Sequence, residues 1–433
     1  MILSFLKIGN GTTWPGLIFE KYFPSAVGLL VNRDCKVILI SGTNGKTTTR
    51  SMLVKIYEDQ SIEACTNRGG ANIFRGVAAA LLSNLRWTGK LKSQNIILEV
   101  EEATMPILTQ FIKPNQIILT NIFRDQMDAY GEIDTTLKYF VQTLDNLQNN
   151  NFDLIINKDD VKLLTILDHP RPNINLIGYG IDDSTAILPD YELSENKTAV
   201  QYAHSFVADS IVSKNLKVTF EVNNNSTSGL SPTNFKIKTQ LLGVYNIYNN
   251  LAAIATTFGQ LETESIINSL ESVQPVFGRG EKVLLPNNSQ IIMLLVKNPA
   301  GMNQVFELIK TNFETESLGL NFLLNDNIAD GRDVSWLWDC NFEDLVSSLN
   351  GSSVQYSTSG SRGLDMLLRL ETAGANVGLN NNCTAISDLV SELNKKNNSN
   401  KTQLILATYT AMLEFRTELG KFVELEGIGG KGN

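Results

Sequence analysis

The chain has 433 residues, of which 42% are hydrophobic and 19% charged, and its formal net charge is −9. This length predicts two or three domains with sizeable cores, and the composition excludes a largely disordered or low-complexity chain. The negative charge argues against nucleic acid as a partner, because phosphate backbones are bound by clustered Lys and Arg.

The cysteines and the N-terminal residues indicate the compartment. The four cysteines are Cys35, Cys65, Cys340 and Cys383. They are far apart and include no C-x-x-C pair, which indicates buried reduced thiols rather than a zinc ribbon or a disulfide framework. Residues 1–16 contain Lys7 and no small-residue cleavage site, so they do not read as a signal peptide. No apolar run approaches the ~18 residues of a membrane span. We therefore expect a cytoplasmic protein that does not itself cross a membrane.

The first 160 residues have the pattern of a parallel sheet with helices on both faces. Four short runs are continuously apolar, as in strands that are buried on both sides, and helical segments lie between them. The predicted strands are 36–41, 95–100, 116–120 and 153–157, and the predicted helices are 50–59, 106–112 and 135–147.

The pattern changes between about residues 180 and 240, where Thr, Ser and Asn are frequent. The alternating runs 216–222 and 234–239 predict antiparallel strands, and we interpret this segment as a β-rich insertion. Helical patterning returns at 245–261.

A second alternating α/β series follows. It predicts strands at 290–296, 318–324 and 403–407, and helices at 303–311, 342–348, 363–373 and within 381–396. We therefore expect two domains, at residues 1–284 and 285–433.

The strongest chemical signal is Gly42-Thr-Asn-Gly-Lys-Thr-Thr-Thr49, between a predicted strand and a predicted helix. A glycine loop in this position presents backbone N–H groups and a positive helix end to phosphate, Lys46 can reach the β and γ phosphates, and the Thr47 hydroxyl can bind Mg²⁺. The loop departs from the general Walker pattern, which would place Gly where Ile40 stands. The alternative is an ordinary strand-to-helix turn with a surface lysine.

A carboxylate near this loop would complete a magnesium site, because Mg²⁺ bound to phosphates usually takes one or two carboxylates from the protein. Glu99 supplies one at the end of the predicted strand 95–100, and Glu101 and Glu102 follow. Three acids this close would repel one another unless a cation or a basic partner were present. For Glu101 and Glu102 a solvated acidic loop is the alternative.

Several motifs together resemble the Mur ligase family, whose members form amide bonds through an acyl phosphate. They occur in the family's order and comprise the glycine loop, Leu98-Glu99, Thr120-Asn121-Ile122, Gly243-Val-Tyr-Asn246 and Gly278-Arg279-x-Glu281. Further motifs resemble one branch of the family, the ligase subunits of lipid II isoglutaminyl synthase. These are residues 121–131, 243–249, Asp330-Gly-Arg-Asp-Val-Ser-Trp336, Thr408-Tyr-Thr-Ala-Met412 and Trp14-Pro-Gly16.

The resemblance implies an α/β fold, with a central P-loop domain that carries the β-rich insertion and a smaller Rossmann-like C-terminal domain. It implies ATP-dependent amidation of the D-glutamate α-carboxyl in the lipid II stem peptide to D-isoglutamine, at the cytoplasmic face of the membrane. The ammonia would come from a GatD-type glutaminase that forms a heterodimer with this chain.

The resemblance also implies roles for single residues. ATP would be bound by Gly42, Thr43, Asn44, Gly45, Lys46, Thr47, Thr48, Asn246, Asn249 and Arg279. Lys46 and Arg279 would stabilise the transferred phosphoryl group, Thr47 and Glu99 would hold Mg²⁺, and Asn246 would contact adenine. A plain helix N-cap is the alternative for Asn246, and a structural surface arginine for Arg279.

Two departures from the family change what we expect of metals. Gln126 stands where Mur ligases usually carry a His that binds a second metal, which puts a second Mg²⁺ in doubt. Relatives of this branch often hold zinc with four cysteines in the insertion, whereas residues 180–240 contain no cysteine, so we expect no zinc. Lys138 lies near the position of a carbamylated lysine in other members, but its surroundings do not match and we assign it no role.

Glutamine hydrolysis within this chain is not expected, because the only histidines, His169 and His204, have no neighbouring cysteine. Asp333 lies in a polar loop after a predicted strand, where α/β sheets place functional groups. The resemblance implies that Asp333 completes a glutaminase triad with the partner's cysteine and histidine. An Asx turn is the alternative for Asp326, Asp330 or Asp333.

Two other readings stay open. A ligase of the same fold that resembles folylpolyglutamate synthase would add an amino acid instead of ammonia. A nucleotide-binding scaffold would show no turnover, although it would have no use for Lys46, Thr47, Glu99 and Arg279 together.

Overall fold

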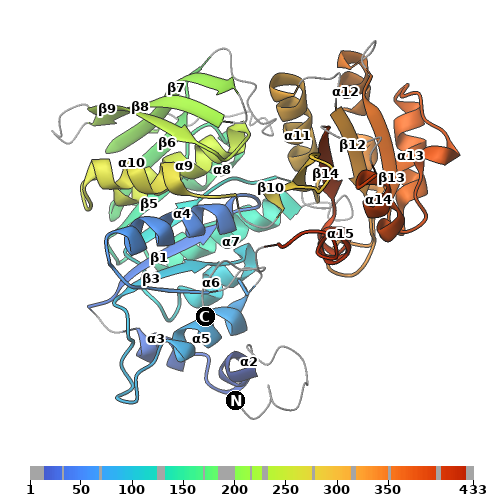
Figure 1. Cartoon of the computed structure of the whole chain (residues 1–433). Helices are drawn as coiled ribbons and strands as arrows, with labels where there is room; N and C mark the ends of the chain where they lie inside the picture. Colours follow the sequence, from blue (N-terminus) through green and yellow to red (C-terminus); the bar gives the residue numbers. More distant parts are fainter. Residues whose placement is uncertain are drawn as a thin grey trace.

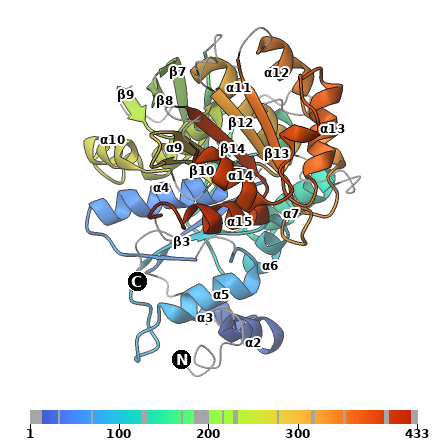
Figure 2. The same ribbon diagram turned by 45° about the vertical axis from the view of Figure 1, so that its right-hand side comes forward.

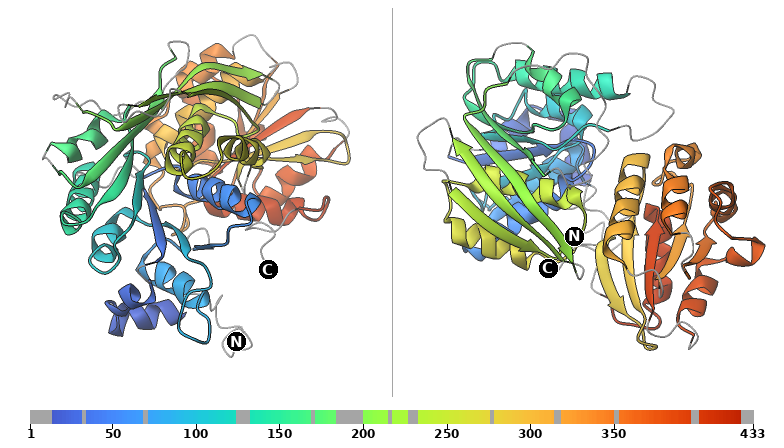
Figure 3. Two further views of the ribbon diagram at one scale, coloured as in Figure 1. Left: turned by 90° about the vertical axis from the view of Figure 1, so that its left-hand side faces the viewer. Right: turned by 90° about the horizontal axis from the view of Figure 1, so that it is seen from above.

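The computed structural model consists of two α/β units, each built around its own sheet (Figure 1). The structure describes residues 14–31, 34–67, 71–123, 132–168, 171–183, 200–214, 217–226, 233–275, 278–313, 318–349, 353–395 and 401–425. Seen from above, the two units lie side by side (Figure 3, right). Gln126 and His169 lie outside the described residues.

The first unit contains a nine-stranded sheet in the order β2-β3-β1-β4-β5-β6-β7-β8-β9. The strands are β1 (Lys36–Ser41), β2 (Ala64–Thr66), β3 (Asn95–Glu99), β4 (Gln116–Leu119), β5 (Phe152–Asn157), β6 (Ile174–Ile181), β7 (His204–Lys214), β8 (Lys217–Ser226) and β9 (Thr233–Thr239). Strands β2 to β7 run parallel, whereas β7, β8 and β9 pair antiparallel. The antiparallel strands predicted near 216–239 are therefore confirmed, and they extend the main sheet.

Helices cover both faces of this sheet, as its continuous hydrophobicity predicts. They are α2 (Trp14–Tyr22), α3 (Ala26–Leu30), α4 (Lys46–Asp59), α5 (Phe74–Ser83), α6 (Met105–Leu108), α7 (Glu132–Asn146), α8 (Val161–Leu164), α9 (Val244–Thr257) and α10 (Thr263–Ser272). Alternate residues of β1 point to different cores: Ile38 and Ile40 pack with α4, α9 and α10, and Val37 and Leu39 pack with α5, α6 and α7.

The second unit contains a five-stranded sheet in the order β10-β11-β14-β12-β13, in which β10 alone is antiparallel. Its strands are β10 (Arg279–Leu284), β11 (Gln290–Leu295), β12 (Leu318–Leu323), β13 (Gln355–Ser359) and β14 (Thr402–Ala407). Its helices are α11 (Pro299–Asn312), α12 (Phe342–Ser348), α13 (Gly363–Thr372), α14 (Ile386–Leu393) and α15 (Tyr409–Leu419). The buried residues of α14 and α15 pack on one face of the sheet, and those of α11, α12 and α13 pack on the other.

Strand β10 bears on the domain boundary predicted after residue 284. Residues Arg279–Leu284 pair with β11 and belong to the second sheet. Because sheet pairing ties a strand to its unit more strongly than its position in the sequence does, we propose that the C-terminal domain begins with β10 and not at residue 285.

Candidate active site

The predicted phosphate loop lies between β1 and α4. Gly42 and Gly45 both have positive φ angles, of 124° and 90°, which glycine adopts without strain. A Cβ atom on Gly42 would collide with the side chain of Thr120, and one on Gly45 with the side-chain oxygen of Asn249. The helix begins at Lys46, so its positive end and its first N–H groups face this loop.

Asn121, which follows β4, holds the loop in shape. The N–H of Thr43 donates to the Asn121 carbonyl at 2.9 Å, and the N–H of Asn44 donates to the Asn121 side-chain oxygen at 2.9 Å. The Asn121 amide donates back to the Asn44 carbonyl at 3.1 Å. The motif Thr120-Asn121-Ile122 thus fixes the glycine loop from the neighbouring strand.

We predict that Gly45→Ala lowers the free energy of unfolding by about 2–4 kcal/mol, because it adds backbone strain at φ 90° to a clash with Asn249. Gly89→Ala is the matched control: its φ is 77° and no atom lies within 4 Å of an added Cβ, so strain alone should cost about 1 kcal/mol. Chemical denaturation of both variants measures the difference. Equal losses would contradict the close contact between the loop and α9.

Thr47 and Glu99 meet as the magnesium prediction requires. The Thr47 hydroxyl donates to Glu99 Oε1 at 3.0 Å, and Glu99 is only 3% exposed. Among the described residues, Glu99 Oε2 is buried and accepts no hydrogen bond, although the Arg50 guanidinium lies 3.6 Å away. A buried carboxylate oxygen without a hydrogen bond, next to a hydroxyl and a phosphate loop, fits an Mg²⁺ ion that takes its other ligands from phosphate and water.

Lys46 points back over the loop that precedes it. Its Nζ atom donates to the Gly42 carbonyl, to the Thr43 carbonyl at 3.3 Å, and to Glu102 Oε1 at 2.7 Å. The ammonium group therefore sits at the mouth of the glycine loop, where it can meet a phosphate oxygen once it leaves Glu102.

The acidic residues after β3 have basic partners within the chain. Glu102 pairs with Lys46, and burial raises the pKa of Glu101, with the charge of Glu102 adding to the shift and those of Lys46 and Lys297 opposing it. Lys297 follows β11 in the second unit. Lys297 is thus a residue of the second unit whose charge reaches Glu101.

Two contributors were not identified from the sequence. Arg50, on α4, donates to Thr66 Oγ1 and the Asn67 carbonyl and forms the ion pair with Glu99, and burial lowers the pKa of this arginine. Asn67 hydrogen-bonds both the N–H and the carbonyl of Glu99, at 2.9 and 2.7 Å. The position of Arg50 one turn after Lys46 was the only signal, and Asn67 had none.

Asn246 and Asn249 lie on α9 and are almost fully buried. The Asn246 amide donates to the Leu242 carbonyl at 2.7 Å, and the Asn249 amide donates to Asn246 Oδ1 at 3.0 Å. Asn249 Oδ1 accepts from Thr49 on α4 at 3.3 Å. The helix N-cap is Gly243 and not Asn246. The two asparagines thus connect α9 to the helix that carries the phosphate loop.

Arg279 opens β10 between Gly278 and Gly280, whose φ angles are 65° and 95°. Its charge acts on Tyr245 in the first turn of α9: burial raises the pKa of Tyr245, and Arg279 opposes that shift. Arg279 therefore lies close to the helix that holds Asn246 and Asn249, at the junction of the two units.

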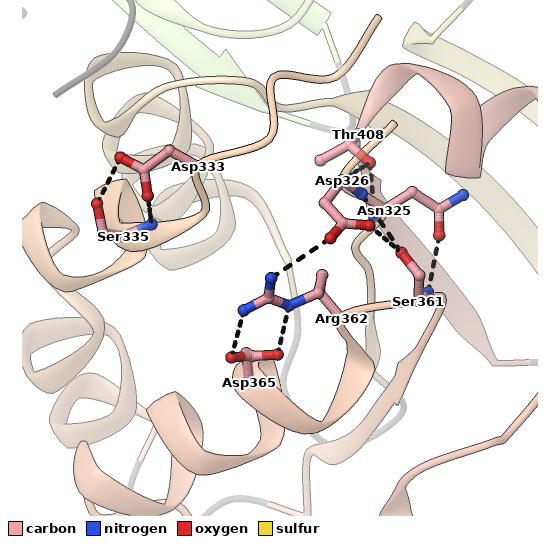
Figure 4. Close-up of polar contacts among 8 residues, drawn as sticks. All are labelled: Asn325, Asp326, Asp333, Ser335, Ser361, Arg362, Asp365 and Thr408. Carbon is pink, nitrogen blue, oxygen red and sulfur yellow. Dashed lines mark hydrogen bonds and ion pairs between the residues drawn. The ribbon is translucent and has the colours of Figure 1, made fainter. Parts of the chain in front are cut away.

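Asp333 lies in the loop that follows β12, next to Ser335 (Figure 4). Its carboxylate accepts from the Ser335 N–H and from the Ser335 hydroxyl, both at 2.8 Å. A carboxylate that accepts from the backbone N–H two residues later in the chain forms an Asx turn, which is the alternative stated for Asp333. The hydrogen bond from the Ser335 N–H has the larger effect and that from the Ser335 hydroxyl the smaller, and together they hold the pKa of Asp333 below its usual value.

The other acids of this loop have structural partners. Asp330 accepts from the N–H of Thr410 at 2.7 Å and so caps the start of α15. Asp326 accepts from Ser361 Oγ at 2.8 Å and from Arg362 at 3.3 Å (Figure 4). Asp333 therefore differs from both, because it contacts only its own turn among the residues described around it.

The glycine loop, Lys46, Thr47 and Glu99 together have the side chains and the arrangement expected of a site for a nucleoside triphosphate. Two family models match the chain: the Mur ligase middle domain at residues 40–257 and the MurT ligase C-terminal domain at residues 295–412. The chain is 30% identical over 438 aligned residues to the MurT subunit of the glutamine-hydrolyzing lipid II isoglutaminyl synthase of Streptococcus pneumoniae, covering 95% of this chain and 92% of that protein.

Solved structures share the fold. The UDP-N-acetylmuramoylalanyl-D-glutamyl-2,6-diaminopimelate–D-alanyl-D-alanyl ligase of Acinetobacter baumannii superposes with a TM-score of 0.66 at 16% identity, covering 92% of this chain and 80% of that one. The MurF ligase of Thermotoga maritima, solved in complex with ADP, superposes with a TM-score of 0.62 at 13% identity, covering 93% and 85%.

Proposed function

The chain belongs to the Mur ligase family, in its MurT branch, and we propose that it is the ligase subunit that amidates the D-glutamate α-carboxyl of lipid II to D-isoglutamine. The observation that carries this proposal is the match of residues 295–412 to the MurT-specific domain, on the chain that also brings the glycine loop, Thr47 and Glu99 together. Mur ligases use ATP, which fits this loop. The match to the MurT ligase C-terminal domain favours this function over the amino-acid ligase and the scaffold.

The proposed reaction has two steps. The stem-peptide carboxylate takes the γ-phosphoryl group of ATP, and ADP leaves. Ammonia then attacks the carbonyl carbon of the acyl phosphate, phosphate departs, and the amide remains. Both steps depend mainly on positioning and on stabilising negative charge, because phosphoryl transfer needs little covalent chemistry from the protein.

The residues of the site would divide this work. The loop residues 42–48 would cradle the phosphates, and Lys46 would exchange Glu102 for a phosphate oxygen. Mg²⁺ bound by Thr47 and Glu99 would supply positive charge to the phosphates. Arg279 would approach the same phosphates from the domain junction, and Asn246 and Asn249 would hold the adenine side of the pocket.

The ammonia would come from a GatD-type glutaminase bound in a heterodimer. The name of the Streptococcus pneumoniae relative makes that protein a subunit of a glutamine-hydrolyzing enzyme, which agrees with this proposal. Asp333, a half-buried carboxylate in the loop after β12, would orient the partner's histidine. Lipid II would be met at the cytoplasmic face of the membrane, and none of the described helices is long and apolar enough to span a bilayer. We expect no zinc, because residues 180–240 contain no cysteine.

The decisive experiment follows ADP release by the purified chain with lipid II and ammonium, and determines the product's stem peptide by mass spectrometry. We expect amidated product with ammonium alone, and use of glutamine only after the glutaminase subunit is co-expressed. Turnover that requires an added amino acid would support the peptide-ligase alternative instead. ATP hydrolysis that ignores every acceptor would contradict the ligase assignment.

A further inference from the structure

A tryptophan is fully exposed at the tip of a short hairpin between α5 and β3. Trp87 contacts no core, although tryptophan is among the side chains that gain most from burial. Burial of this side chain against a partner outside the chain would recover the free energy that its exposure forgoes.

Backbone hydrogen bonds define the shape of the hairpin. Leu85 and Leu91 form an antiparallel bridge, and Leu91 is buried. The Arg86 N–H donates to the Lys90 carbonyl at 2.8 Å, and the Gly89 N–H donates back to the Arg86 carbonyl at 3.0 Å. Gly89, at φ 77°, closes this turn. The backbone thus holds Trp87 at the apex, pointing away from the molecule.

The same hairpin is basic. Arg86, Lys90 and Lys92 are exposed, and no Asp or Glu occurs from residue 64 to residue 98. Within the described part of the chain, none of the three cations forms an ion pair. The chain as a whole has a net charge of −9, so the charge of the hairpin is opposite in sign to that of the chain.

Helices α2 and α3 add apolar surface at the same end of the molecule. The two helices pack on α5, which leads directly into the hairpin, and the three elements lie together at the lower end of the molecule (Figures 1 and 2). Exposed side chains on or between them are Leu17, Ile18, Tyr22, Phe23 and Leu29, of which Leu29 is 82% exposed. We call these five residues and the hairpin 84–93 the basal surface.

We propose that the basal surface docks on an anionic lipid bilayer. Tryptophan and tyrosine prefer the membrane–water interface, and lysine and arginine near it are attracted by anionic lipids. The inference rests on the proposed function in one respect. If the substrate is lipid-linked, docking of the enzyme on the bilayer confines enzyme and substrate to one plane.

The test is co-sedimentation of the full chain with vesicles that contain no lipid II and no nucleotide. We expect binding to vesicles of phosphatidylcholine with phosphatidylglycerol, weak binding to phosphatidylcholine alone, and loss of binding as salt rises. Trp87→Ala should weaken partitioning roughly tenfold. Lys90→Ser and Lys92→Ser should weaken it about fivefold each.

Trp338→Ala is the matched control, because Trp338 is the other described tryptophan that is exposed and it lies in the second unit. It should leave partitioning unchanged. Thermal unfolding of Trp87→Ala should match the parent chain, since exposed substitutions change stability by about 0.5 kcal/mol or less.

Equal partitioning of Trp87→Ala and the parent chain would overturn the proposal. So would loss of the glutaminase complex in Trp87→Ala on size-exclusion chromatography, which would make the hairpin a protein interface. Vesicle binding by a chain that fails to amidate lipid II would support the docking surface and contradict the proposed function.

Discussion

Lys46→Ala is expected to lower kcat/KM for ATP-dependent amidation by about 10³-fold or more, while the protein stays folded. Lys46 contacts two loop carbonyls and Glu102, so its ammonium group is held where the phosphates would bind. Removing one preorganised charge from a phosphoryl-transfer site costs this much because the protein contributes little besides positioning and electrostatics. ADP release with lipid II and ammonium, together with thermal unfolding, measures both parts of the prediction.

The same helix offers a matched control. Lys55 lies on α4 and pairs with Asp59 on the surface, so Lys55→Ala should leave the activity within about twofold of the parent chain. Lys46→Arg retains the charge but changes its shape, and should recover only part of the rate. Full activity of Lys46→Ala in the presence of a folded protein would remove the assignment of the phosphate loop.

Much of this fold follows from local patterns. The predicted strand 36–41 is the observed β1, and the predicted helix 342–348 is α12. Buried parallel strands carry unbroken apolar runs, and such runs are the easiest signal to recognise. The helix predicted at 50–59 begins four residues earlier, at Lys46, because its first turn is made of Lys and Thr, whose polarity hides the helical pattern.

Other elements lack such a signal. Strand β13 contains Gln, Tyr, Ser and Thr and lies at the edge of its sheet, and helix α10 was not predicted although it packs on α4. Strand β10 carries charged residues, so it was assigned to the first unit by position alone. Its place in the second sheet is decided by pairing with β11, a tertiary contact that a single sequence does not display.

The site shows the same division. Thr47 and Glu99 could be paired from the sequence. Thr47 follows the loop after the predicted strand 36–41, Glu99 lies near the end of the predicted strand 95–100, and the carboxyl ends of parallel strands meet at one edge of a sheet. Their contact at 3.0 Å agrees with that reasoning. Arg50 and Lys297 could not be predicted as partners of the acids, because the first depends on the side-chain direction of α4 and the second on how the two units face each other.

Asp333→Asn is expected to reduce glutamine-driven amidation by about 10³-fold in the complex with the glutaminase, and to leave ammonium-driven amidation within about twofold. Asparagine keeps a side-chain oxygen that can accept the Ser335 N–H, so the Asx turn should survive and the fold with it. What is lost is the negative charge of the carboxylate, which an orienting group for histidine requires.

Asp330→Ala separates this role from the stability of the loop, because alanine removes both oxygens that accept hydrogen bonds from Thr410. Asp330 caps α15 through Thr410, so its replacement should lower thermal stability and reduce both reactions to a similar extent. Ser335→Ala removes a hydroxyl that binds the Asp333 carboxylate and should leave the glutamine-driven rate within about fivefold, since the backbone hydrogen bond persists. Equal losses of the two reactions in Asp333→Asn would show that the carboxylate serves the ligase itself or the fold, because only a group that acts on glutamine hydrolysis is bypassed by added ammonium.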